Sequence, residues 1–185
     1  VCPPDDWGLF YADLSRFSQL QEIRFLRIKK PELSRKILDL KNLKKVSWIA
    51  CESVGNLGAW KGLANVQQID LIGKVKGLDE LLEKARFSLR LKHLALHNMS
   101  LSGLPKSIFQ LDQLKTLDLT GNQLATLSDA FGKFKNLERL ILVDNNFSTI
   151  PEVLKRLPKL KWVDFYGNPI QFSDEDRHWL KGLEK

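Results

Sequence analysis

The sequence predicts an α/β solenoid in which seven short parallel strands are stacked in chain order. The prediction starts from residues 114–124, which have the pattern LxxLxLxxNxL with the fixed residues Leu114, Leu117, Leu119, Asn122 and Leu124. The same pattern returns 23 residues later from Leu137, and 23 residues later again from Leu160. Three copies in one phase indicate an internal repeat, and a repeat of this length is typical of a solenoid.

The same phase extends backwards through four more units. The units begin at residues 20, 43, 66, 91, 114, 137 and 160, and only the step from 66 to 91 needs 25 residues instead of 23. In each unit the first, fourth and sixth residues are apolar, which is the alternation of a strand with one face turned inward. Every unit runs in the same direction, so the strands must be parallel and the rest of each unit must cross back over them.

The ninth position of each unit should turn the chain away from its strand. Units five to seven have asparagine there, whose amide can bond the backbone of its own and of the adjacent turn to form a ladder. The ladder residues are Asn122, Asn145 and Asn168. Units one to four have Ile28, Cys51, Lys74 and Met99 instead. We interpret Cys51 as a buried structural substitute and expect looser turns in the first three units.

The whole chain, 1–185, is predicted to be one domain: an N-terminal cap (1–19), seven repeats (20–170) and a C-terminal cap helix (171–185). Fuller return helices are expected over Pro31–Leu40 and over Asp79–Phe87, with Asp79 as N-cap. Shorter helical turns are expected within 104–111, 127–134 and 150–157, the first and last entered at Pro105 and Pro151.

Helical caps are expected at both ends, because the ends of a solenoid expose core. At the N-terminus a helix should start at Pro4, and at the C-terminus residues 173–176 (Ser-Asp-Glu-Asp) have the sequence of a capping box. Trp179, Leu180 and Leu183 would then cover the last unit. Trp48, at an inward position, and Trp60, on a return segment, are interpreted as core.

Composition excludes several classes of protein. The 185 residues are 43% hydrophobic but contain no apolar run of about 20 residues, so no transmembrane span is expected. Two cysteines, Cys2 and Cys51, make neither a disulfide framework nor a metal cluster, although a bridge between them stays open. The net charge of +7 is consistent with an anionic partner, although solvated lysine-rich faces are the favoured explanation.

Residues 20–170 resemble a leucine-rich repeat protein. The repeat length and the Leu-Pro-x-x-Ile-x-x-Leu return segment (residues 104–111) are similar to bacterial repeat proteins, including those of leptospires, and to intracellular phosphatase-regulator-like repeats. The N-terminal half departs from the regular pattern. The resemblance implies a curved solenoid with a parallel sheet on the concave face and helices and turns on the convex face. It also implies protein binding without catalysis, so we expect a non-enzymatic interaction module, monomeric and without cofactor.

In such a fold the variable strand positions point to the concave surface. Two apolar groups occur there. The first is a strip formed by Leu26, Ile49 and Ile72, which a bent N-terminal cap would partly cover on an alternative interpretation. The second group lies near the C-terminus and has the composition of a binding hot spot. Its members, with the charged residues that flank them, are Ile141, Val143, Trp162, Tyr166, Arg139 and Asp164.

Two histidines and three aspartates occupy variable positions and are candidates for a chemical site. His93 and His97 are four residues apart on a strand, about 13 Å, which is too far for a shared zinc ion. Asp70, Asp118 and Asp164 lie in alternate units, about 10 Å apart, a spacing that could suit inverting carboxylates. No nucleophile elbow, phosphate loop or metalloprotease signature accompanies them. We therefore predict no metal and no enzyme, and place all five residues in a polar binding groove.

A basic run supports an alternative function. It lacks interleaved exposed aromatic residues, which disfavours nucleic acid. The alternative is an adhesin, secreted or associated with a bacterial envelope, that binds an anionic polymer such as a glycosaminoglycan; an intracellular location is the other option. The run comprises Lys29, Lys30, Arg35, Lys36, Lys41, Lys44 and Lys45.

Overall fold

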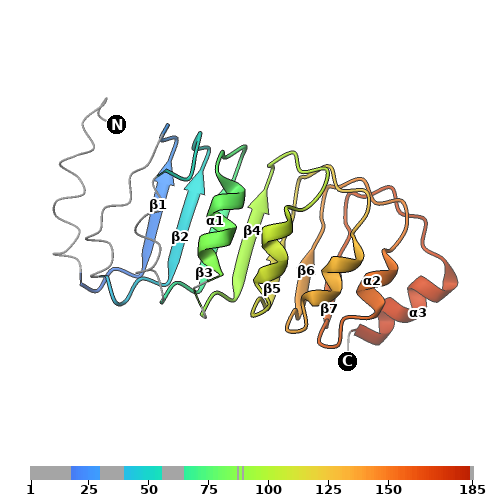
Figure 1. Ribbon diagram of the computed structural model, residues 1–185. Coiled ribbons are helices and arrows are strands. Elements are labelled where there is room, and N and C mark those ends of the chain that lie inside the picture. Colours follow the sequence, from blue (N-terminus) through green and yellow to red (C-terminus); the bar gives the residue numbers. More distant parts are fainter. Residues whose placement is uncertain (1–17, 30–39, 56–64, 87, 89, 184–185) are drawn as a thin grey trace.

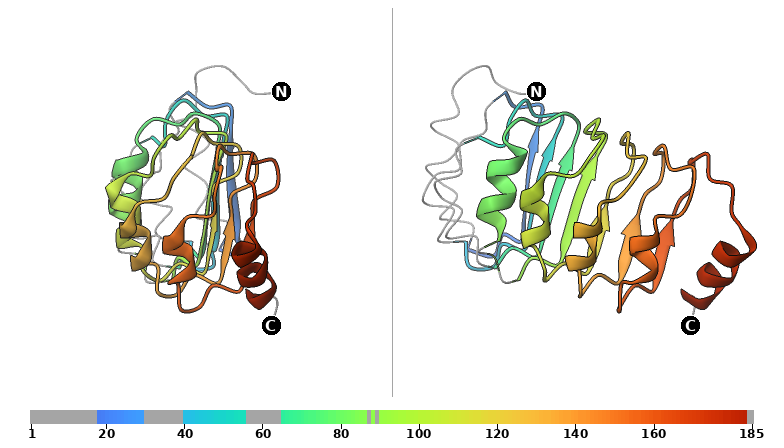
Figure 2. Two further views of the ribbon diagram at one scale, coloured as in Figure 1. Left: turned by 90° about the vertical axis from the view of Figure 1, so that its right-hand side faces the viewer. Right: turned by 45° about the vertical axis from the view of Figure 1, so that its right-hand side comes forward.

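The computed structural model describes residues 18–29, 40–55, 65–86, 88 and 90–183. Seven strands form one parallel sheet in chain order (Figure 1). Helices and helical turns cover one face of that sheet and leave the other face open (Figure 2). The strands are β1 (Glu22–Leu26), β2 (Lys45–Ile49), β3 (Gln68–Ile72), β4 (His93–His97), β5 (Thr116–Asp118), β6 (Arg139–Ile141) and β7 (Trp162–Asp164).

The expected inward positions form the core. In β4, Leu94 and Leu96 are buried, while His93 between the same turns is exposed. The register of the sheet pairs equivalent positions at every junction, for example Ile69 with Leu94 and Leu94 with Leu117. The alternation of apolar residues therefore fixes both the strand and its register, since a shift by one residue would expose this whole set. Trp48 is fully buried, as expected, and stacks on the Phe25 ring at 5.5 Å.

Each strand ends in a turn whose backbone is the same in all seven units. The eighth residue of every unit has a left-handed φ, between 52° and 93°. In the first six units its N–H donates to the seventh-position carbonyl of the next unit, as from Arg27 to Ile49 (2.9 Å) and from Asp144 to Tyr166 (2.8 Å). The eighth residues of the first three units thus share the backbone form of the later ones, and the expectation of looser turns there stays a prediction. This inter-unit hydrogen bond, which requires no particular side chain, sets the turn. The seven residues are Arg27, Ala50, Gly73, Asn98, Gly121, Asp144 and Gly167.

The asparagine ladder is present where the sequence predicts it. The amide of Asn122 donates to the carbonyls of Leu96 and Leu119, both at 2.8 Å, and its Oδ1 accepts from Met99 N at 3.1 Å. Asn145 and Asn168 repeat the arrangement one and two units later. Each side chain thus satisfies buried backbone groups of two adjacent units, which water cannot reach.

Cys51 occupies the same place in unit two. It is a free, buried thiol, and its Sγ donates to the carbonyl of Phe25 at 3.4 Å, across to the preceding unit. Asn122 bonds Leu96, the equivalent residue of its own preceding unit, in the same way. A thiol is a weaker donor than an amide and cannot serve two units at once as strongly. The structural interpretation of Cys51 is confirmed.

The helices of the described return segments become shorter along the chain. They are α1 (Leu78–Ala85), the 3₁₀ turns η4 (Lys106–Gln110) and η5 (Asp129–Lys133), and α2 (Glu152–Lys155). Pro105 and Pro151 precede η4 and α2, as expected. The expected helix Asp79–Phe87 needs correction at its start, because the N-cap is Gly77 in a left-handed conformation and Asp79 lies in the first turn. The Asp79 carboxylate instead accepts a hydrogen bond from the Ser107 hydroxyl at 2.9 Å, which joins α1 to η4.

A final helix, α3 (Asp174–Leu183), lies beyond β7 (Figure 1). Ser173 and Asp176 form the expected capping box: Asp176 N donates to Ser173 Oγ (3.1 Å), and Ser173 N donates to the Asp176 carboxylate (3.2 Å). Trp179 and Leu180 pack against the core. Lys155 of α2 lies 3.2 Å from Asp176, and its ion pairs, led by Glu152 at 2.8 Å, raise the pKa of Lys155 above its usual range.

Several expectations fall outside the described residues: the N-terminal cap helix, the helix over Pro31–Leu40, the placement of Trp60 and that of Cys2. The division of the chain into one domain with two caps stays a prediction. Within the described residues, no helix is both long enough and apolar enough to cross a membrane.

The ladder leads to a first prediction. Asn145→Ala should lower the free energy of unfolding by about 1–3 kcal/mol, because it leaves the buried Leu124 N–H without an acceptor. It also removes one of the two amide donors to each of the carbonyls of Leu119 and Leu142. Urea unfolding followed by circular dichroism measures the change. Asn146→Ala, at the exposed neighbouring position, is the control and should shift stability by no more than about 0.5 kcal/mol. Equal losses in the two variants would contradict the structural role of the ladder.

Candidate functional site

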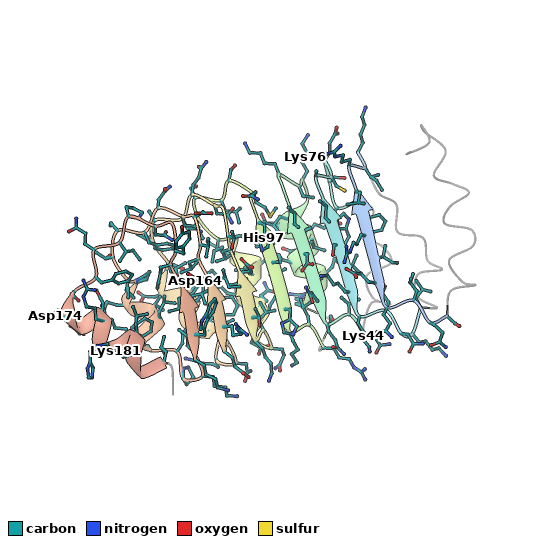
Figure 3. All side chains as sticks on the ribbon, turned by 180° about the vertical axis from the view of Figure 1, so that it is seen from behind. Lys44, Lys76, His97, Asp164, Asp174 and Lys181 are labelled. Atoms are coloured by element: carbon teal, nitrogen blue, oxygen red, sulfur yellow. The ribbon has the colours of Figure 1, made fainter. Side chains whose placement is uncertain are left out.

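The open face of the sheet, called here the concave face, is built from the third, fifth and seventh positions of each unit. The strand register lines up third positions from Glu22 to Trp162 and fifth positions from Arg24 to Asp164. The hydrogen bonds at the turns extend the alignment to the seventh position in all units. The three expected columns are therefore present, and all eleven candidate residues belong to them. Figure 3 shows two of these residues, His97 and Asp164, on the sheet.

The N-terminal apolar strip is contiguous. Leu26 pairs with Ile49 and Ile49 with Ile72 in the sheet register. Leu26 is 51% exposed, and the other two side chains are half-buried. The N-terminal cap that the alternative interpretation places over the strip belongs to residues outside the described part.

Beside this strip lies a network of charges centred on Asp70. Its carboxylate, which is nearly buried, accepts hydrogen bonds from Ser47 Oγ (3.2 Å) and Gln68 Nε2 (3.0 Å). Lys45 Nζ lies 2.8 Å from Asp70 and 3.6 Å from Glu22, so it connects two units. These groups largely satisfy one another. These charged groups are therefore already paired with one another and are not free to bind a ligand.

The two histidines at the centre of the face have different environments. His97 Nε2 lies 2.8 Å from Asp118 Oδ2, although the ring N–H is not well aligned with that oxygen. The Asp118 contact is the main cause of a raised pKa for His97. The pKa of His93 is instead lowered, chiefly by partial desolvation and also by the charge of Lys115. The pairing of His97 with Asp118 was not foreseen, although both residues were candidates.

Asp118 is held in place by two further hydrogen bonds. Its Oδ1 accepts from Thr120 N at 3.0 Å and from Thr120 Oγ1 at 2.6 Å. Burial acts to raise the pKa of Asp118, but His97 and Thr120 together lower it below its usual value. Asp118 and Asp70 are thus occupied by neighbouring side chains, and Asp164 accepts a hydrogen bond from Tyr166 N at 2.8 Å. No group of three or more His, Cys, Asp or Glu side chains in the described residues could hold a metal ion.

The C-terminal apolar cluster contains Tyr166, the most exposed large hydrophobic side chain of the described residues. Tyr166 is 78% exposed, and the ring of Trp162 is half-buried beneath the Arg139 guanidinium, whose carbon lies 4.9 Å from the ring centre. Ile141 and Val143 of the preceding unit are half-buried alongside. Aromatic rings and an arginine held by stacking present a large contact area with little rotamer entropy left to lose.

Comparison with known proteins gives a consistent picture. The family model described as leucine rich repeat matches residues 90–147. The chain is 32% identical to bovine Toll-like receptor 6 over 95 residues, which is 51% of this chain and 12% of the receptor. It is 44% identical over 71 residues to an inactive leucine-rich repeat receptor-like serine/threonine-protein kinase of Arabidopsis thaliana, covering 37% of this chain and 11% of that protein. The chain thus matches only a small part of each curated relative.

Solved structures match over a longer stretch. A leucine-rich repeat protein of Leptospira interrogans superposes with a TM-score of 0.69 at 25% identity, covering 92% of this chain and 43% of that one. An internalin of Listeria monocytogenes superposes with a TM-score of 0.63 at 16% identity, covering 93% of this chain and 48% of that one. The second likeness concerns the fold alone.

The contact between His97 and Asp118 predicts a pH dependence of stability. The folded state raises the pKa of His97 above its ordinary 6.5, so protonated His97 stabilises the fold. This stabilisation is complete below pH 6.5 and is lost as the pH rises through the folded-state pKa. The folded state lowers the pKa of Asp118 from 3.8, so the stabilisation by its ionised carboxylate is lost only as the pH falls through that lower folded-state pKa. His97→Gln should therefore lower the free energy of unfolding by up to about 1 kcal/mol at pH near 5.5, and by less at pH near 8.5.

Urea unfolding of both proteins at the two pH values checks this prediction. His93→Gln is the matched control and has the opposite sign, because the folded state lowers the pKa of His93 and so disfavours its protonation. If His97→Gln changes stability equally at both pH values, the contact with Asp118 contributes no charge-dependent stability.

Proposed function

Because residues 90–147 match the leucine rich repeat family and the sheet has the fold of such proteins, we propose that the chain is a non-enzymatic interaction module that binds a protein partner on its concave face. Leucine-rich repeat proteins bind other proteins, and they are typically interaction modules without catalytic activity. The observation that carries the proposal is the C-terminal cluster, where Tyr166, Trp162 and Arg139 lie together on the open face. We expect the protein itself to be a monomer.

The hydrogen bonds and ion pairs of the concave face indicate where on that face a protein partner would bind. Asp70 and Asp118 already have neighbouring partners, so a ligand would gain little there without breaking existing contacts. Near the C-terminus the exposed surface is aromatic and aliphatic, and its burial is worth roughly 25 cal/mol per Å². We therefore assign the main contact to Ile141, Val143, Trp162 and Tyr166 with Arg139 and Asp164 at its edge.

The other candidate residues would have a secondary role. Leu26, Ile49 and Ile72 supply a second apolar strip that an elongated partner could reach. His93 and His97 lie between the two apolar groups. A partner that spans the face would pass over them, and its affinity would then depend on the charge of these rings.

The anionic-polymer alternative receives less support at the N-terminal basic run. Lys30, Arg35 and Lys36 are outside the described residues, and Lys45 is engaged by Asp70 at 2.8 Å. Lys29 follows β1 whereas Lys44 precedes β2, so these two residues lie at opposite ends of the strands. We therefore rank a role as an envelope-associated adhesin acting through this run below protein binding.

The cellular location of the protein is also a proposal. The solved relatives include an internalin of Listeria monocytogenes and the leucine-rich repeat domain of a type III effector. We propose a bacterial protein that acts outside the cell or at its envelope, where its partner would belong to a host; an intracellular site of action is the alternative.

The hot spot is tested with the variants Trp162→Ala and Tyr166→Ala. Each should weaken binding at least about 30-fold, because exposed aromatic anchors at interfaces often contribute 2 kcal/mol or more. The immobilised wild-type protein captures partners from a host-cell lysate, mass spectrometry identifies them, and a purified partner is then titrated against each variant. Circular dichroism and urea unfolding confirm that the variants fold.

Leu26→Ala is the matched control, since it truncates an exposed apolar side chain at the other end of the same face. It should change the affinity by less than about threefold if the C-terminal cluster is the main contact. Full affinity in both Trp162→Ala and Tyr166→Ala would rule out the assigned hot spot, and a loss in Leu26→Ala alone would move the contact to the N-terminal strip.

A further inference from the structure

The positive charge of the chain is concentrated on one edge of the solenoid. At the edge where the strands begin, called here the strand-entry edge, lie Lys41, Lys44, Lys92, Lys115, Lys159 and Lys161. Arg90 and Lys135 belong to the same edge, and Asp112 and Glu138 are its acidic residues. The edge has eight basic and two acidic side chains, so it accounts for most of the net charge of +7.

The opposite edge, where the strands end, is much closer to neutral. Among the described residues it carries Arg27, Lys29, Lys74 and Lys76, balanced in part by the acidic Glu52 and Asp144. Figure 3 shows the separation, with Lys44 at one edge of the sheet and Lys76 at the other. The asymmetry is therefore a property of one surface and not of the composition as a whole.

The backbone holds the basic residues in a regular row. The second residue of each unit donates its N–H to the second-position carbonyl of the preceding unit, as from Lys115 to Lys92 (2.8 Å) and from Lys161 to Glu138 (2.9 Å). The row from Lys44 to Lys161 thus advances by about 4.8 Å per unit and spans roughly 24 Å. Side-chain amides reinforce it, because Asn65 Nδ2 donates to the Lys41 carbonyl at 2.9 Å.

Most of these lysines form no ion pair with an acidic side chain of the described residues. The ion pairs formed by the described part of this edge involve one carboxylate, that of Glu138, which lies 2.9 Å from Lys115 and 3.3 Å from Lys161. Lys44, Lys92 and Lys159 contact neutral amides instead, with Nζ 2.7–3.5 Å from Gln21, Gln113 and Asn136 respectively. Rows of lysine interleaved with amides offer both cations and hydrogen-bonding groups to a ligand.

We propose that the strand-entry edge binds a linear sulfated polysaccharide, which would lie along the row of lysines across several units. A single row suits one extended chain of anions better than the plane of a membrane surface. The described edge positions include no aromatic residue on which a base could stack, which disfavours single-stranded nucleic acid. Lysine is a point charge well suited to sulfate groups, and the amides suit sugar hydroxyls. This surface is separate from the apolar cluster of the concave face.

Retention on immobilised heparin in a rising salt gradient tests the inference. The wild-type protein should elute above physiological ionic strength, about 0.15 M. The double variant Lys92→Glu with Lys115→Glu should elute below it. The control, Lys74→Glu with Lys76→Glu, makes the same change in net charge at the other edge and should remain close to the wild type. A sulfopropyl resin, which responds to overall charge, should retain the two double variants equally.

A gain of binding is expected as well. Glu138→Gln removes the carboxylate between Lys115 and Lys161 and should raise the eluting salt concentration, whereas Glu52→Gln on the opposite edge should not. Equal shifts of the two double variants on heparin would overturn the proposed edge site, as would wild-type elution below physiological ionic strength. Tighter binding to duplex DNA than to heparin at equal salt would overturn the choice of polysaccharide.

The same set of proteins separates this inference from the proposed protein binding. Trp162→Ala should keep its retention on heparin, and the Lys92→Glu and Lys115→Glu double variant should keep its affinity for a captured protein partner. A loss of both properties in either variant would show that the two surfaces act as one site, which contradicts the inference as stated.

Discussion

The fold depends on one repeated hydrogen bond at the end of each strand. The residue in the left-handed conformation directs its N–H to the seventh-position carbonyl of the next unit, in the same way from Arg27 to Asp144. This bond continues the sheet past its last paired strand residue and aims the chain away from the concave face. This bond fixes the distance between adjacent units, which sets the spacing of the strands, of the side-chain columns and of the two edges. Residues with very different side chains can occupy the position because the constraint is on the backbone.

The regular spacing separates two kinds of surface with different chemistry. On the concave face, charges cluster around Asp70 and Asp118 and satisfy one another, which leaves the aromatic cluster around Trp162 as the exposed contact area. Along the strand-entry edge, Lys44 and Lys92 form no ion pair with a described carboxylate, whereas Lys115 and Lys161 share that of Glu138. The same register that pairs opposite charges within the sheet thus lines up like charges at its border.

Much of this architecture could be predicted from the sequence because it depends on apolar alternation. The alternation of apolar and polar residues in β4 is enough to predict that Leu94 and Leu96 are buried and that His93 is exposed. The capping box at Ser173 could be predicted as well, because it depends only on residues close together in the sequence. The start of α1 could not be predicted, because Gly77 can adopt the left-handed N-cap conformation that displaces Asp79. The contact of His97 with Asp118 joins different columns of adjacent units, so neither strand alone contains its signal. A search for opposite charges at diagonal positions would have found it.

The asparagine ladder also implies an order in which the structure loosens. Asn122, Asn145 and Asn168 each fasten two neighbouring units through several buried hydrogen bonds, whereas Cys51 does so with one weak thiol donor. In a linear repeat protein each unit contacts only its neighbours, so the strength of an interface between two units mainly affects the stability of those two units. Amide protons of the last three units should therefore exchange with solvent as one slow cooperative block. Fraying would start among the earlier units, so a ligand that spans the whole array would gain part of its affinity by ordering that end.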